Sequence, residues 1–101
     1  MRTYGQYCPV ARTSELLAER WTPIIIRNLL TGCRTFTEIR QGAPGIPPAL
    51  LTKRLATLER HGIVERERCA TGRGWSYRLT ERGQDLKAVC DAMGQWGARW
   101  L

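Results

Sequence analysis

The chain has 101 residues, of which 43% are hydrophobic and 25% are charged. This length supports one domain with a single core, and this composition is ordinary for a globular protein, which argues against a disordered chain and against a membrane span. The 16 Lys and Arg residues outnumber the nine Asp and Glu residues, and the net charge of +7 favours an anionic partner, above all nucleic acid.

The chain before residue 33 predicts two helices and no targeting segment. Residues 1–7 are polar and no apolar stretch follows, so we expect no signal peptide and a cytoplasmic location. Pro9 suits the first turn of the first helix. Thr22 and Pro23 predict the N-cap and first residue of a second helix that is apolar nearly all round, and Gly32 predicts its end. The apolar residues of the first helix are Val10, Leu16, Leu17 and Trp21.

A helix-turn-helix is predicted over residues 35–62. Thr35 and Glu38 form a capping box that opens a short third helix, and Gly-Ala-Pro-Gly at residues 42–45 predicts a turn. In the fourth helix, which ends at His61, three leucines repeat at i, i+4 and i+7. The face opposite these leucines has small and hydrogen-bonding side chains and two positive charges, and consists of Ala49, Thr52, Lys53, Ala56, Thr57 and Arg60.

Residues 63–79 predict a β-hairpin, and a last helix follows it. Two extended segments, 63–69 and 75–79, are joined by a glycine-rich tip that carries Arg73. Thr80 is the expected N-cap of the last helix. The apolar stripe of that helix is longer than a small core requires, and it consists of Leu86, Val89, Cys90, Met93, Trp96 and Trp100.

This order of elements predicts a mainly α fold with a small β-hairpin, the winged helix-turn-helix, in a single domain over residues 1–101. Residues 8–31 and 80–101 are expected to form the core and dimerisation helices. Residues 35–62 are expected to form the helix-turn-helix and residues 63–79 the wing.

The charge is distributed unevenly along the chain. Residues 34–62 carry five basic and two acidic side chains and residues 63–83 carry five and three, whereas residues 84–101 carry two of each. A basic middle and a neutral, apolar end indicate one surface that faces an anion and another that faces protein.

The predicted fourth helix suits the major groove of B-DNA. That groove is about 12 Å wide and admits one helix, whose small side chains let the backbone approach the base edges. Lys53 would donate to guanine or to a phosphate, and Arg73 would enter the minor groove. The candidate DNA-binding residues are Arg34, Thr35, Thr37, Ala49, Thr52, Lys53, Arg54, Thr57, Arg60 and Arg73.

From about residue 7 to its end, the chain resembles the HxlR-type winged helix transcriptional regulators. The matching motifs are Cys8-Pro9-Val10, Arg20-Trp21-Thr22, residues 34–39, 44–46, 51–55 with Leu58, 62–66 and 77–83. The resemblance implies a bacterial homodimer that binds double-stranded DNA through the fourth helix and dimerises through the first and last helices. The dimer residues are then Leu86, Val89, Met93, Trp96 and Trp100. Two features depart from the family, since Pro47 stands where a Ser or Thr cap is usual and the wing is shorter.

The four cysteines stand at positions 8, 33, 69 and 90. They form no Cys-x-x-Cys pair, so we expect no metal site, no cofactor and, in the cytoplasm, no disulfide. Cys90 is expected to be a buried thiol. Cys8 precedes the first turn of a helix and stands four residues before Arg12, and both features favour a thiolate. Some HxlR-type regulators sense oxidants with a cysteine at this place, so Cys8 is a candidate redox sensor, with a plain packing residue as the alternative.

Other function classes have less support in the sequence. The single histidine, His61, stands at a helix end, and we find no paired carboxylates, phosphate loop or nucleophile elbow, so we expect no enzyme. An RNA binder would expose aromatic residues, whereas Trp21, Trp96 and Trp100 have core or dimer spacing. Trp75 alone is ambiguous, and a core position in a strand is favoured for it. A winged helix that contacts protein without reading DNA stays open as the alternative. The sequence identifies no small-molecule effector.

Overall fold

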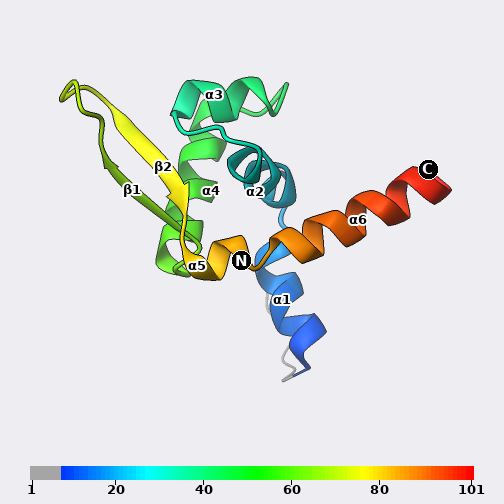
Figure 1. Cartoon of the computed structure of the whole chain (residues 1–101). Helices are drawn as coiled ribbons and strands as arrows, with labels where there is room; N and C mark the ends of the chain where they lie inside the picture. The colour runs from blue at the N-terminus through cyan, green and yellow to red at the C-terminus, as the bar shows by residue number, and fades with distance from the viewer. Residues whose placement is uncertain (1–7) are drawn as a thin grey trace.

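The fold is built around helix α2, whose Ile25, Ile26 and Leu29 are at most 1% exposed, as its apolar sequence predicts. The computed structural model describes residues 8–101, so the polar segment 1–7 lies outside the described residues. Figure 1 shows the hairpin and α6 extending from the body of the molecule in different directions. The elements in chain order are α1 (Pro9–Leu17), α2 (Thr22–Leu30), α3 (Phe36–Gln41), α4 (Pro48–Arg60), β1 (Val64–Arg68), β2 (Trp75–Leu79), α5 (Glu81–Gln84) and α6 (Lys87–Trp100).

The junction between α1 and α2 differs from the sequence prediction by one residue. The N-cap of α2 is Trp21, with a left-handed φ of 79°, and Thr22 is the first helical residue. The Thr22 N–H donates to the Glu19 carbonyl and closes the turn before α2. Trp21 therefore does not belong to α1, which ends at Leu17, and packs against the core from the turn instead. A positive φ is uncommon outside glycine, which is why the sequence pattern missed it.

Polar contacts around the buried Asn28 fix the helix-turn-helix against α2. Asn28, 3% exposed, donates from Nδ2 to the Ile39 carbonyl at 3.1 Å, and its Oδ1 accepts from Arg27, which also donates to the Gly42 carbonyl. The capping box at Thr35 is present as predicted. These contacts hold α3 and the following turn to the central helix, and so set the position from which α4 starts.

The hairpin is attached to the helix-turn-helix along β2. Its strands are antiparallel and Val64 pairs with Leu79, which places the base of the hairpin in the core. Beyond β1, β2 also borders the segment before α3, where the Tyr77 N–H donates to the Arg34 carbonyl at 2.7 Å. The wing is therefore anchored beside α3 and α4.

The single last helix that the sequence predicts is two helices. Thr80 caps α5 as expected, because its side chain accepts from the Gly83 N–H. The Leu86 N–H then donates to the Gly83 carbonyl, a tighter i to i+3 turn that separates α5 from α6. The direction of α6 is set at this turn, and from it α6 leaves the body of the molecule (Figure 1).

Gly83→Ala is expected to destabilise the fold by about 1–3 kcal/mol, the effect of overpacking a well-packed site. A Cβ at this position would lie 2.3 Å from the Ile63 carbonyl oxygen, which is backbone and has little room to move. The midpoint of urea unfolding measures the loss. Gly97→Ala is the control, because nothing lies within 4 Å of its Cβ position, and there alanine should be neutral or stabilising. Equal midpoints for the two variants would contradict the prediction.

Candidate nucleic-acid interface

Helix α4 presents the outward face that the sequence predicts. Leu51, Leu55 and Leu58 are at most 2% exposed, which fixes the rotation of the helix about its axis. On the opposite side the small and basic residues face solvent fully or in part; Ala49, Thr52, Lys53 and Arg60 are exposed, and Ala56 and Thr57 are half-buried. The helix begins with Pro47 as N-cap, which makes no side-chain cap hydrogen bond, and Pro48 as its first residue. Two exposed prolines leave few free backbone N–H groups there, so affinity for an anion has to come from side chains.

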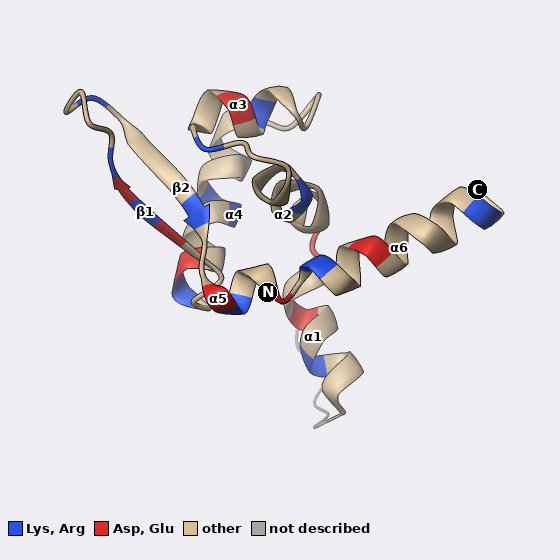
Figure 2. Cartoon of the chain, viewed as in Figure 1, with Lys and Arg blue, Asp and Glu red and all other residues tan. Residues whose placement is uncertain are grey.

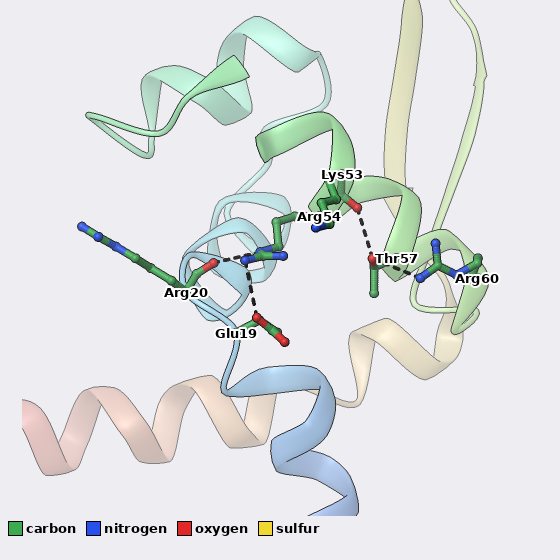
Figure 3. A network of polar contacts seen from close by, with 6 residues as sticks. All are labelled: Glu19, Arg20, Lys53, Arg54, Thr57 and Arg60. Carbon is green, nitrogen blue, oxygen red and sulfur yellow. Dashed lines mark hydrogen bonds and ion pairs between the residues drawn. The ribbon is translucent and has the colours of Figure 1, made fainter. Parts of the chain in front are cut away.

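Among the described residues, the two cations of this face, Lys53 and Arg60, are not paired with carboxylates. The Arg60 guanidinium donates to the Thr57 hydroxyl at 3.3 Å, and that hydroxyl donates to the Lys53 carbonyl (Figure 3). Among residues 8–101, neither Lys53 nor Arg60 has an ion-pair partner. Both charges are therefore available to an anion that approaches α4.

Arg54 has a different environment from its neighbours on α4. Its Nε donates to the Arg20 carbonyl at 3.0 Å and its Nη2 lies 3.5 Å from a Glu19 carboxylate oxygen (Figure 3). The Arg54 side chain is only 15% exposed. It ties α4 to the turn between α1 and α2, a contact across 34 residues of sequence that no local pattern predicts.

The candidate DNA-binding residues around α3 also differ in whether their side chains are free or engaged within the protein. Thr37 is exposed, but Thr35 is occupied in the capping box. The Arg34 side chain turns back to the carbonyls of Leu29 and Cys33, so it caps α2. The backbone N–H groups of Arg34 and then Thr35 donate to Glu38 and lower the pKa of that carboxyl.

The wing carries exposed arginines besides Arg73, the one wing residue that the sequence pattern assigned to DNA. Arg73 is exposed at the tip, as expected. Trp75, expected in a strand core, is 36% exposed, and the guanidiniums of Arg66 and Arg68 lie 4.3 and 4.6 Å from its ring centre. Arg68 pairs with Trp75 across the hairpin, and Arg66 lies two residues away on the same face. Arginines two residues apart in one strand were the signal in the sequence for this cluster. Arg66 also pairs with Glu59 of α4 at 3.1 Å.

Charge divides the molecule into two regions. In Figure 2, Lys and Arg lie on α3, on α4 and along the hairpin, whereas most of α6 is uncharged. The exposed apolar residues of α6 increase in exposure toward its end; Val89 is 37% exposed, Met93 51%, Trp96 60% and Trp100 63%. Leu86, the first residue of the predicted stripe, is half-buried.

An apolar hollow lies between α1, the start of α2 and α6. Its volume is about 450 Å³, and Val10, Leu17, Pro23, Val89 and Met93 are among its lining residues. It continues the apolar stripe of α6 onto the first helix. The two segments that the sequence assigned to dimerisation therefore share one apolar surface.

Cys8 lies at the N-terminus of α1 and is exposed. The backbone N–H groups of Ala11 and then Val10, at the start of the helix, lower the pKa of the thiol, although the Cys8 side chain makes no cap hydrogen bond. Arg12, the second cause that the sequence suggested, does not contribute to this lowering. Burial instead raises the pKa of Cys90, which is only partly buried.

Within residues 8–101, no three His, Cys, Asp or Glu side chains gather so as to hold a metal ion. No helix in the same range is long and apolar enough to cross a bilayer.

Comparison with known proteins places these features in one family. A family model described as HxlR-like helix-turn-helix matches residues 16–101. The HTH-type transcriptional regulator sll1512 of Synechocystis, itself uncharacterised, is 34% identical over 96% of this chain and 73% of its own length. The reduced form of the transcriptional regulator YodB from Bacillus subtilis is 36% identical, with a TM-score of 0.78 over 94% of this chain and 95% of YodB. YodB structures also include a diamide-treated and a quinone-bound form.

A further solved structure, that of PA1607, has a TM-score of 0.87 and 31% identity over 96% of this chain and 68% of its own. These likenesses confirm the winged helix-turn-helix fold, mainly helical with a two-stranded hairpin, that the order of elements predicts.

Proposed function

The chain belongs to the HxlR-like helix-turn-helix family of transcriptional regulators, and on that premise we propose that two copies of it bind a pseudo-palindromic operator as a symmetric dimer. The observation that carries the proposal is the outward face of α4, which is small-sided and basic while the leucines behind it are buried. Membership of this family also means that the chain is not an enzyme, as the sequence analysis expected.

In the complex, α4 enters the major groove. Ala49, Thr52 and Ala56 let the helix backbone approach the base edges, and Lys53 donates to a guanine or to a phosphate. Arg60, with Thr57 beside it, contacts the backbone of the duplex, and Thr37 and Arg73 reach phosphates from α3 and from the wing tip. Arg34, Thr35 and Arg54 act behind this surface, because their side chains are engaged within the protein.

The dimer forms through α6 and α1. A stripe ending in two tryptophans that are 60% and 63% exposed needs cover, and an isologous contact lets one copy cover the other. Residues 8–31 and 80–101 form this part of the domain, residues 35–62 the reading unit and residues 63–79 the wing. Two-fold symmetry places the half-sites about one helical turn, ~10 bp, or a small multiple of it apart.

A gel shift tests the proposal most directly. The DNA flanking the protein's own gene is the probe, with a shuffled sequence of the same length as control, at two salt concentrations. We expect a discrete complex with the flanking DNA that weakens steeply as salt rises, because phosphate contacts release counterions. Equal affinity for both sequences would reject specific readout and favour the alternative, a winged helix that contacts protein.

We infer further that Cys8 makes DNA binding sensitive to oxidants or electrophiles. The support is an exposed sulfur at a helix N-terminus that lowers its pKa, in a chain similar to YodB, of which diamide-treated and quinone-bound forms are known. Oxidation or alkylation at this position would act on α1, which lines the apolar hollow beside α6.

Diamide treatment is expected to lower the operator affinity of the wild type and to leave Cys8→Ser unchanged. Fluorescence anisotropy with labelled operator measures both affinities before and after treatment. Cys90→Ser is the matched control, since burial raises the pKa of that thiol and makes it less reactive, and it should respond as the wild type does. An identical response of all three proteins would remove Cys8 from the mechanism.

A further inference from the structure

A polar pocket lies on one flank of α4, and we propose that it binds a small oxyanion, a carboxylate or a phosphate, which takes Lys53 and Arg60 away from DNA. The pocket has a volume of about 180 Å³, and its polar lining residues are Glu19, Thr22, Lys53, Arg54, Thr57 and Arg60. We call it the α1–α4 pocket, because its remaining walls are Leu16 of α1 and Leu58 of α4. The inference rests on the proposed function, since Lys53 and Arg60 are the cations assigned there to DNA.

The pocket is on the side of α4 away from the wing. Glu59, on the wing side of the helix, pairs with Arg66 of β1. Thr57 and Arg54 lie on the other side, where Arg54 reaches Glu19 and the Arg20 carbonyl (Figure 3). None of the pocket's lining residues belongs to the hairpin, so a ligand can occupy it without touching the wing.

The charge of the pocket favours an anion. Glu19 is its single carboxylate and lies 3.5 Å from Arg54, so these two charges offset each other. Lys53 and Arg60 remain, with no ion-pair partner in residues 8–101. Two unpaired cations in one recess attract an anion more strongly than the same cations on an open surface, because the low-dielectric walls reduce screening.

Thr22 is the observation that points to a ligand. It is 2% exposed and lines the pocket, yet its hydroxyl makes no hydrogen bond with any described residue. Within residues 8–101, every side-chain oxygen or nitrogen that is fully shielded from solvent has a hydrogen-bond partner. Because the Thr22 hydroxyl oxygen has no partner, it must retain some solvent-accessible surface. Thr22 is one of the residues that line the recess, so the recess is open space next to this side chain. A hydroxyl in this position is a ready donor to an oxyanion.

The size of the pocket limits the ligand. A volume of 180 Å³ is below the range of about 300–1,000 Å³ that suits drug-sized molecules. A phosphate ion or a small carboxylate fits, with the two leucines beside its apolar part. Since the anion and DNA use the same two cations, a ligand at ten times its Kd should lower DNA affinity by about elevenfold.

The test uses the free, full-length protein without DNA. Inorganic phosphate and sodium benzoate are titrated separately by calorimetry, with chloride keeping the ionic strength constant. We expect saturable binding of one anion per chain for at least one of them, and the two arms separate a phosphate ligand from a carboxylate ligand. Absence of saturable binding by both probes would overturn the proposal.

Two variants change the affinity for the anion in opposite directions. Thr22→Val keeps the shape of a buried side chain and removes the hydroxyl donor, so binding should weaken about 13-fold, the value of one hydrogen bond to a charged group at its lower end. Glu19→Gln removes the only carboxylate that lines the pocket and should tighten anion binding several-fold. Damage to the fold would not tighten binding. If both variants bind the anion as the wild type does, the pocket is not the site.

The same variants separate this inference from the proposed function. Loss of DNA binding by the wild type in the gel shift would reject the proposed function, whereas anion binding to the free protein is measured without DNA. Thr22→Val should leave operator affinity unchanged when no anion is present. If Thr22→Val instead weakens DNA binding, the pocket receives a phosphate of the duplex, and the inference of a small ligand is overturned.

Discussion

Trp96→Glu is expected to convert the protein from a dimer to a monomer at micromolar concentration and to remove most of its operator affinity. Trp96 is 60% exposed on the apolar stripe of α6, and tryptophan is the residue most enriched among interface hot spots, where truncation costs about 2 kcal/mol or more. In a two-fold dimer each substitution acts twice, so the dimer should lose about 4 kcal/mol, close to a thousandfold in its dissociation constant.

Analytical ultracentrifugation measures the association state, and the gel shift measures the affinity for operator. Gln95→Glu is the matched control, because it adds the same charge at an exposed position one residue earlier, about 100° around α6 from Trp96 and outside the apolar stripe. It should remain dimeric. The Trp96→Glu monomer should still be folded and show a cooperative unfolding transition, because the buried core around α2 does not include Trp96. A wild-type chain that is itself monomeric would contradict the dimer.

Local chemistry explains which elements the sequence predicts well. The capping box at Thr35 needs only residues three positions apart, and the leucine period of α4 needs only one helix face. Both are present in the structure. The left-handed Gly32 after α2 is another local signal that is confirmed, since its φ of 111° is accessible to glycine at no steric penalty.

Tertiary contacts explain what the sequence misses. Arg54 has the same local pattern as Lys53, but the turn before α2 brings it the Glu19 carboxylate and, from 34 residues away, the Arg20 carbonyl. Trp75 has the apolar character of a core residue, but its place near the wing tip leaves it beside two arginines rather than in the core. These environments depend on how helices and strands pack against one another. The residue pattern of a single strand or helix carries no information on that packing.

The α1–α4 pocket belongs to the same class. Thr22 has the sequence signature of an N-cap, and its hydroxyl would then be used by its own helix. The left-handed turn at Trp21 moves Thr22 one position into α2, where its side chain makes no cap and lines the pocket instead. A shift of one residue in the start of a helix thus converts a structural hydroxyl into an available one.

Lys53→Ala and Arg73→Ala are expected to weaken DNA binding in two different ways. In the proposed complex Lys53 faces the base edges, and losing a base contact would cost about 1–3 kcal/mol per chain, or about 2–6 kcal/mol for the dimer, with relaxed preference at the contacted position. In the same proposal Arg73 at the wing tip contacts phosphate or the minor groove, so its loss should weaken specific and non-specific binding alike. The loss of Arg73 should also reduce the slope of log affinity against log salt concentration by about one released counterion per chain.

Fluorescence anisotropy with operator and shuffled duplexes, at four salt concentrations, separates the two effects. Arg78→Ala is the control, because it removes the same charge from the hairpin at an exposed position that pairs with Glu65 at 3.6 Å. Since Arg78 alternates with the buried Tyr77, its side chain points away from the core face of the wing, and its loss should change neither slope nor specificity. Equal losses for Lys53→Ala on operator and shuffled DNA would show that Lys53 contacts only phosphate. If neither Lys53→Ala nor Arg73→Ala changed the binding, α4 and the wing would not face the duplex, because two cations at a DNA surface have to leave a trace in the salt dependence.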